Sequence, residues 1–217
     1  MGRICNPGLP GKELVCMNRA VLVLMLLAML TSGSAVANDL LLAPTGVTLT
    51  TGQDRAEAAL NDNGKYFWLG TGFKAYELNV VHIDSNPDGN ENLIGAQWNF
   101  IPETIFTPAV AFGVRDAASE SKEGIGAYFA ITRHLPLPER SILEDFGLTF
   151  GLGAVGIRGP FFGFQAELAR HFLAEGEYDS QNFNAAVGWE AMPNFKIKAY
   201  IIRGEAYFGA QLERMDF

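Results

Sequence analysis

The side chains best suited to acid–base chemistry in this 217-residue chain are its three histidines, His82, His134 and His171. None of them is followed or preceded by a second ligand at a spacing typical of a metal site, so no metal ligands are predicted. His82 is followed by Asp84 and Ser85, the residue types of a hydrolase triad. Neighbouring residues of a strand point to opposite faces, so this local order does not indicate a triad. We therefore predict no catalytic residues, and we expect replacement of any histidine to leave function intact.

Other chemical signatures point the same way. The sequence has no P-loop, dinucleotide-binding glycine pattern, zinc pattern or calcium-binding loop, and its Gly-x-Gly runs at 70–72, 124–126 and 151–153 lie in predicted strands. No cofactor is therefore expected. The formal net charge of −8 argues against nucleic acid as a partner, because nucleic-acid binding needs a basic surface. Only 18% of residues are charged, while the chain contains 24 glycines and 16 phenylalanines, an unusual composition for a soluble enzyme.

Alternation of apolar and polar residues dominates the chain after residue 52, which predicts β-strands. Turn residues such as Asn61-Asp62-Asn63-Gly64 separate the alternating runs. Eleven strands are predicted, with 47–51 as a candidate for a twelfth; they lie near 53–60, 65–72, 74–83, 92–101, 107–116, 123–133, 146–157, 161–171, 182–191, 194–203 and 205–214.

One face of these strands carries large apolar side chains, and the other carries glycine and alanine mixed with polar residues. Small residues give a water-exposed strand poor propensity, but they suit a crowded, curved lumen. We therefore predict an all-β, closed antiparallel up-and-down transmembrane β-barrel of 10–12 strands, most simply 12. The polar residues predicted to face the lumen are Glu77, Asn79, Gln97, Asn99, Arg115, Gln165, Glu167, Asn184, Glu190, Lys196, Lys198, Gln211 and Glu213.

Charges inside a barrel either line an aqueous path or pair with each other and fill the lumen. A barrel of this size with long polar side chains inside leaves little free space, so we favour a filled or narrow lumen. Arg115, Lys196 and Lys198 are expected to pair with lumen glutamates, namely Glu77, Glu167, Glu190 or Glu213. Aromatic residues near strand ends are expected to form girdles at the membrane interfaces: Tyr66, Phe67, Trp68, Phe100, Phe106, Phe161, Phe162, Trp189, Phe195 and Tyr207.

The first residues have the pattern of an export signal. Met17-Asn18-Arg19 is basic, residues 20–30 are apolar, and Ala35-Val36-Ala37 matches a cleavage site. The apolar run is shorter than the roughly 20 residues of a spanning helix, which disfavours the alternative of an uncleaved anchor. We predict an upstream extension at 1–16, a signal peptide at 17–37, an N-terminal lead segment at 38–52 and a β-barrel domain at 53–217. Both cysteines precede residue 38, so the exported part has no disulfide.

Two stretches carry a resemblance to a known family. Residues 107–116 read TPAVAFGVRD and are followed by AYFAITR at 127–133, and residues 177–179 read EYD before Asn184. With Pro44-Thr45-Gly46 before the first strand, the chain resembles the YjbH-like outer-membrane barrels associated with exopolysaccharide production. The residues matching that family's motifs are Pro108, Gly113, Asp116, Glu177, Tyr178, Asp179 and Asn184. The chain departs from the family at 117–121, where the family loop is usually Gly-rich, and it is far shorter than full-length members.

From the residues alone, we expect Glu177-Tyr178-Asp179 to order a loop by hydrogen bonds. The resemblance implies an exported, non-enzymatic bacterial outer-membrane barrel linked to envelope structure or exopolysaccharide export. The alternatives are a small-solute pore of the same fold, a barrel enzyme acting on lipid, and a soluble periplasmic β-protein that binds a lipid or a partner. Expected partners are outer-membrane lipid, polysaccharide or export-machinery proteins, and the barrel-assembly machinery during insertion, with no nucleic acid.

Overall fold

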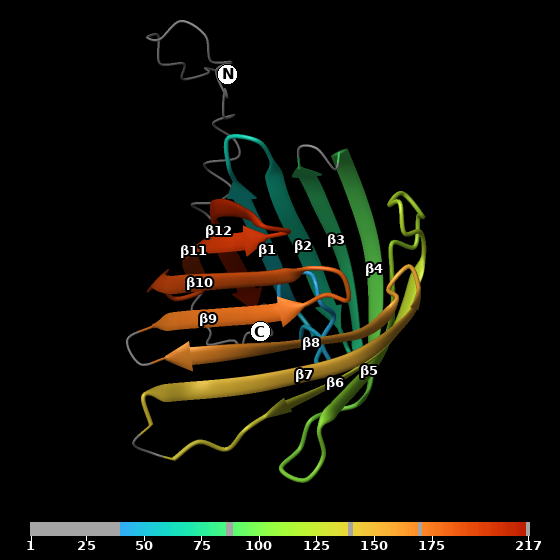
Figure 1. The fold of residues 1–217 in the computed structure, drawn as a ribbon. Coiled ribbons are helices and arrows are strands. Elements are labelled where there is room, and N and C mark those ends of the chain that lie inside the picture. Colours follow the sequence, from blue (N-terminus) through green and yellow to red (C-terminus); the bar gives the residue numbers. More distant parts are fainter. Residues whose placement is uncertain (1–39, 86–88, 139–140, 169–170, 216–217) are drawn as a thin grey trace, which may run out of the picture.

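The computed structural model describes residues 40–215, apart from 86–88, 139–140 and 169–170. The predicted upstream extension and signal peptide lie outside the described residues. Twelve strands form the fold (Figure 1): β1 (Gln53–Leu60), β2 (Lys65–Phe73), β3 (Tyr76–Ser85), β4 (Gly89–Ile101), β5 (Ala109–Arg115), β6 (Gly126–His134), β7 (Leu143–Val155), β8 (Gly159–Leu168), β9 (Phe172–Tyr178), β10 (Phe183–Met192), β11 (Phe195–Ile202) and β12 (Glu205–Met215). The described residues include no helix long and apolar enough to cross a membrane.

Each strand pairs in antiparallel fashion with its neighbours in sequence, and β1 closes the ring by pairing with β12. Ala58 of β1, for example, lies opposite Phe67 of β2 on one side and Ala210 of β12 on the other. The predicted closed up-and-down barrel of 12 strands is therefore confirmed. Closure gives every strand a partner on both sides, as a sheet in lipid requires.

The twelfth strand is not the one that the alternation suggested. Residues 47–51 do not form a strand, and the predicted run at 161–171 instead ends at Leu168, with a separate strand β9 beginning at Phe172. Strand β9 has only seven residues, and Glu175 and Glu177 occupy two of its buried positions. The strand signal of this short segment is weak, because its central outward positions hold only Ala174 and Gly176, between the two inward carboxylates.

The two rims of the barrel carry different connections. We call the rim where β1 begins and β12 ends the terminal rim; it includes the 102–108 and 135–142 connections. The opposite rim includes the 61–64, 116–125 and 179–182 connections. In Figure 1 the opposite rim is the upper one for strands β1 to β4.

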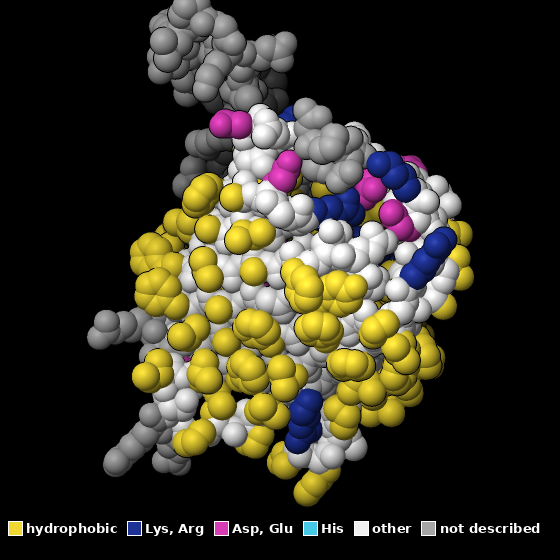
Figure 2. Space-filling view, in the orientation of Figure 1, with side chains coloured by type: hydrophobic (Ala, Val, Ile, Leu, Met, Phe, Trp, Pro, Cys, Tyr) yellow, Lys and Arg dark blue, Asp and Glu magenta, His cyan; other side chains and the backbone are white. Residues whose placement is uncertain are grey.

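The outer wall is apolar between the rims, and Figure 2 shows hydrophobic side chains over most of the visible wall, with charged side chains gathered mainly at the upper rim. Large apolar residues that point outward and stay exposed include Phe67, Leu69, Leu78, Val80, Ile94, Phe112, Leu148, Phe150, Leu152, Phe162, Val187, Ile197, Ile201 and Phe208. An exposed apolar surface of this extent is unfavourable in water. A closed barrel with an apolar wall is the architecture of outer-membrane β-barrels.

The core of the molecule lies inside the barrel. The largest fully buried aromatic side chains are Tyr66, Phe161, Tyr200 and Tyr207. The prediction that Tyr66, Phe161 and Tyr207 lie in the interface girdles is therefore wrong, and it is also wrong for the buried Trp68. Each occupies an inward position of its strand, so nearness to a strand end did not determine its face.

Candidate functional site

The lumen is occupied by the chain itself. Residues 40–51, which we call the lumen segment, run inside the barrel from the opposite rim to the terminal rim, where β1 begins. Leu41, Leu42 and Leu49 are buried against inward aromatic and aliphatic residues of the wall. Residues 40–51 of the predicted N-terminal lead segment therefore lie inside the barrel.

A single carboxylate holds the start of the lumen segment. Glu177 Oε2 accepts hydrogen bonds from the N–H groups of Leu41 (2.9 Å) and Ala43 (3.0 Å), and Oε1 accepts one from the N–H of Leu42 (2.9 Å). Asn184 Nδ2 donates to Oε1 at 2.8 Å and fixes the carboxylate from the neighbouring strand. Three successive backbone donors that converge on one buried carboxylate form a strong, charge-assisted attachment.

Side chains of the wall also bind the later part of the lumen segment. The Gly46 N–H donates to Thr132 Oγ1 (2.7 Å), and the Gln97 side chain donates to the Val47 carbonyl (2.9 Å). The Leu49 N–H donates to Glu77 Oε2 at 2.9 Å. The backbone of the lumen segment therefore pairs largely with side chains of the wall, because no strand ladder is open to it.

Two glycines make this close passage feasible. A Cβ on Gly46 would lie 2.6 Å from both the Ala109 carbonyl oxygen and the Thr132 nitrogen. A Cβ on Gly72 of β2 would lie 2.2 Å from the Thr50 carbonyl oxygen. Backbone atoms cannot move aside as a flexible side chain can, so both positions require glycine for steric reasons.

The other side of the lumen, formed by β9 to β12 and β1, is filled by paired charges. Lys198 Nζ lies 3.1 Å from Glu57 Oε1 and 2.8 Å from Glu175 Oε1, and it donates to Gln211 at 2.9 Å. Lys196 Nζ pairs with Glu213 Oε1 at 3.3 Å. These groups are almost fully buried, so each charge needs its partner to offset the loss of hydration.

The space left between the lumen segment and the wall is small. The cavity beside it measures about 60 Å³ and is lined by residues of the segment together with Arg55, Glu77, Gln97, Arg115 and Tyr128. A volume of this size holds only a few water molecules. This cavity is therefore too small for a solute of the size of a sugar or an amino acid.

Acidic residues order the connections at the opposite rim. Asp116 accepts hydrogen bonds from the N–H groups of Glu120 and Ser121 and from the Ser121 hydroxyl. Burial alone raises the pKa of Asp116, but these hydrogen bonds and the nearby Arg115 outweigh it, so the pKa lies below the usual range. Asp179 likewise accepts from the N–H groups at 181 and 182, which orders the turn after β9.

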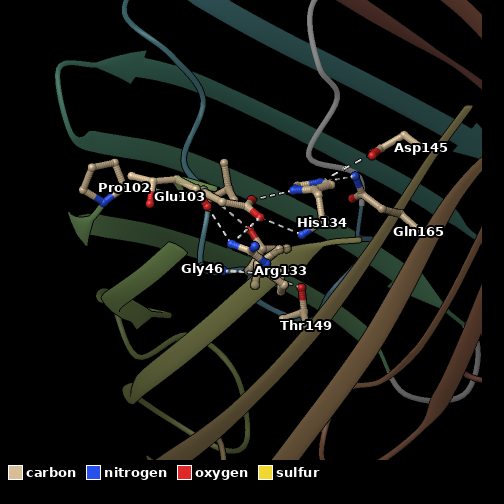
Figure 3. Close-up of polar contacts among 12 residues, drawn as sticks. Gly46, Pro102, Glu103, Arg133, His134, Asp145, Thr149 and Gln165 are labelled. Carbon is tan, nitrogen blue, oxygen red and sulfur yellow. Dashed lines mark hydrogen bonds and ion pairs between the residues drawn. The ribbon is translucent and has the colours of Figure 1, made fainter. Parts of the chain in front are cut away.

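His134 anchors a connection at the terminal rim (Figure 3). Glu103 Oε1 accepts from the His134 N–H (2.7 Å), and Glu103 Oε2 lies 2.6 Å from His134 Nδ1. Nε2 of the ring lies 3.3 Å from Gln165 Nε2 and 3.6 Å from Asp145 Oδ2. The described partners of the ring are the carboxylates of Glu103 and Asp145 and the amide of Gln165. The arrangement fixes the 102–108 connection to β6.

The other two histidines lie apart from His134. His82 Nδ1 is 2.8 Å from Asn92 Oδ1, and His171 Nδ1 is 3.2 Å from Glu190 Oε2. His82 occupies an outward position of β3, between the buried Val81 and Ile83. Among the described residues, no group of three or more histidine, cysteine or acidic side chains is arranged to hold a metal ion.

The structure places all thirteen predicted lumen residues on the inward-facing set of strand positions. Lys196 and Glu213 come together as expected. Glu77 instead binds the lumen segment, Glu190 faces His171, and Arg115 Nη1 lies 3.5 Å from the Leu42 carbonyl oxygen. The expected pairing of Arg115, Glu77 and Glu190 is therefore wrong, because the lumen segment and a rim histidine take up these side chains.

Sequence reasoning missed several residues that contribute most to the interior. Glu57 and Glu175 pair with Lys198, Arg55 pairs with Glu57, and Glu91 pairs with Arg203 at the opposite rim at 3.0 Å. Alternation could have identified Arg55 and Glu57, since they share a face with Gln53. Of the Glu177-Tyr178-Asp179 motif, Tyr178 and Asp179 bind the loop as expected, whereas the described contacts of Glu177 are with the lumen segment and Asn184.

Comparison with known proteins adds little to this description. No family model matches the chain, and no curated protein matches it. Similar solved structures include three mutants of the porin from Rhodopseudomonas blastica, each with three substitutions. Each is 12% identical to this chain, with TM-scores of 0.32 or 0.33, and the match covers 70% of this chain and 56% of the porin chain. The chain thus spans little more than half the length of these porins, and the assignment of its fold rests on its own strand pairing.

Proposed function

We propose that this chain is a non-enzymatic bacterial outer-membrane β-barrel that is closed at rest by its own lumen segment and serves envelope structure or the export of polysaccharide. The observation that carries the proposal is a closed 12-stranded barrel with an apolar wall and a polar interior filled by residues 40–51. Such a wall matches lipid, and such an interior holds a passage shut.

The resemblance to exopolysaccharide-associated barrels supports the link to polysaccharide. Several residues that carry it, including Asp116, Glu177 and Asp179, organise the opposite rim and the start of the lumen segment. Their described contacts are with other parts of the chain. They are therefore suited to set the closed state of the barrel.

A small-solute pore is the second candidate, and one observation favours it. The lumen segment is attached through side chains such as Glu177 and Glu77, and no pair of barrel strands depends on it. Its displacement would open a polar passage and leave the strand pairing of the barrel intact. In this view the pore conducts only after the segment has moved.

Fractionation and electrical recording test these functions. The protein is expected in the outer-membrane fraction, with electrophoretic mobility that changes on heating, as a stable barrel shows. In planar bilayers the wild-type protein is expected to be closed for most of the recording. A strain lacking the protein is expected to export less surface polysaccharide. A soluble periplasmic protein, or a continuously open channel, would contradict the proposal.

A further inference from the structure

An apolar groove crosses the outer wall on β6, β7 and β8. It has a volume of about 480 Å³ and is lined by Ile131, Arg133, Leu148, Thr149, Phe150, Phe162, Gly163 and Phe164. This volume falls within the range of about 300–1,000 Å³ that is typical of small-molecule sites. The groove is therefore large enough for part of a lipid chain.

Strand register explains the shape of the groove. Ile131, Phe150 and Phe162 lie side by side across the three strands and form one wall. Arg133, Leu148 and Phe164 form the other wall. Thr149 lies between these rows, and its hydroxyl is hydrogen-bonded to Thr132 in the lumen. With Gly163 beside it, the floor between the two walls is backbone, which leaves the space open.

Arg133 provides a fixed positive charge at the edge of the groove. Its guanidinium donates to the carbonyl oxygens of Thr104 (2.6 Å), Thr107 (3.0 Å) and Ile105 (2.6 Å). These acceptors are neutral carbonyl oxygens, so they do not offset the positive charge of the guanidinium. Among the described residues, its nearest carboxylate is Glu103, at 3.8 Å, and both oxygens of Glu103 are engaged by His134.

The same contacts hold an apolar loop tip next to the groove. Ile105 is 84% exposed and Phe106 is 92% exposed. The loop that carries them is braced by Arg133 and by hydrogen bonds to Thr104 Oγ1 from the N–H groups of Phe106 and Thr107. A rigid apolar tip beside a cation is suited to the membrane interface, where apolar groups contact lipid and cations contact headgroups.

We propose that this groove binds one acyl chain of an anionic glycerophospholipid, with the phosphate of the lipid beside Arg133. The proposal rests on the proposed function only in placing the outer wall in a membrane. Two observations select lipid as the occupant: the groove continues the exposed apolar wall, and among the described residues that line it, the only charged one is a cation. A site for a protein partner would be expected to have a polar rim around its apolar centre, and the membrane-facing side of the groove has no such rim among the described residues.

Native mass spectrometry of the folded barrel in detergent micelles, titrated with phosphatidylglycerol, tests the proposal. Wild-type protein is expected to retain one lipid more tightly than any further lipid. Ile131→Trp fills the groove and is expected to weaken that first binding by about tenfold or more, the loss of roughly two buried methylene groups. Arg133→Gln is expected to weaken it by about two- to fivefold, as for an exposed charge pair.

Ile197→Trp on β11 is the matched control, because Ile197 also points outward and is exposed but lies far from the groove in the strand order. It is expected to bind lipid as the wild type does. Equal lipid binding by Ile131→Trp and Ile197→Trp, or occupation of the groove by detergent alone, would overturn the proposal that the groove binds lipid. If either result is obtained with a protein that is a heat-modifiable barrel in the outer membrane, only the lipid site is refuted. If the protein is not in the outer membrane or lacks heat-modifiable mobility, the proposed function is refuted.

Discussion

Glu177→Gln is the substitution that most directly tests how the lumen is closed. Each carboxylate oxygen of Glu177 accepts two hydrogen bonds: Oε2 accepts from Leu41 and Ala43, and Oε1 accepts from Leu42 and Asn184. A glutamine has one oxygen and one NH₂ group. Whichever way the amide is turned, its NH₂ group faces two donors and cannot accept from them.

The magnitude follows from that count. Two donors lose their acceptor in a buried setting, at a cost of about 1–3 kcal/mol each, or about 2–6 kcal/mol in total. Because about 1.4 kcal/mol corresponds to a tenfold change in an equilibrium, displacement of the lumen segment should become at least about 30-fold more frequent. The strand ladder is unchanged, so the barrel itself should remain folded.

Cysteine labelling measures this displacement. Thr48 lies in the lumen segment and is only 8% exposed, and both natural cysteines precede residue 38. A Thr48→Cys substitution in the exported chain therefore provides a single buried thiol. Its reaction with a polar maleimide should be slow in the parent and at least about 30-fold faster with Glu177→Gln, if opening precedes labelling.

Glu190→Gln is the matched control, since Glu190 lies on the same inner wall but contacts His171 at the terminal rim. It should leave the labelling rate unchanged. Equal labelling rates for Glu177→Gln and the parent, in barrels that keep their heat-modifiable mobility, would refute the conclusion that this carboxylate holds the lumen segment.

Three further predictions concern the rim, the buried charges and the glycine of the lumen segment. Because the pKa of Asp116 is lowered in the folded protein, the stabilisation by its carboxylate should be complete above the unfolded-state pKa of about 3.9 and be lost as the pH falls below that value. In the wild type, hydrogen exchange of the 117–121 amides should therefore lose its protection only in acid. In Asp116→Ala, the same amides should already lack that protection at neutral pH. Lys198→Met removes the cation that two buried glutamates share and should lower the free energy of unfolding by about 3–5 kcal/mol, measured by urea titration, whereas Lys74→Met on the outside should change it by less than about 0.5 kcal/mol. Gly46→Ala should weaken seating of the lumen segment by about 1–3 kcal/mol through overpacking and so speed the labelling of the Thr48→Cys thiol; an unchanged rate would show that the neighbouring backbone can move aside.

Several features of the fold could be predicted from the sequence because they are local. A strand presents alternate residues to opposite faces, so runs such as Phe162, Phe164 against Gly163, Gln165 specified which side chains point outward. The polar residues and the glycines of these runs share the inner face for the same reason. The apolar outer face indicated a lipid environment. In lipid every backbone polar group must be paired, so the sheet had to close into a barrel.

The interior could not be predicted in the same way, because it depends on residues that are distant in sequence. Glu177 binds Leu41 across 136 positions, and Gly46 binds Thr132 across 86. Short β9 also depends on its neighbours, since its ladder to β8 and β10 compensates for its two buried carboxylates.

Strand periodicity alone thus determined the faces of the wall and the class of fold. Only the tertiary structure decided which charges pair and that residues 40–51 lie inside. The lumen segment has no repeating period of its own, because its backbone is satisfied by side chains of many different strands, and no local pattern in the sequence encodes such contacts.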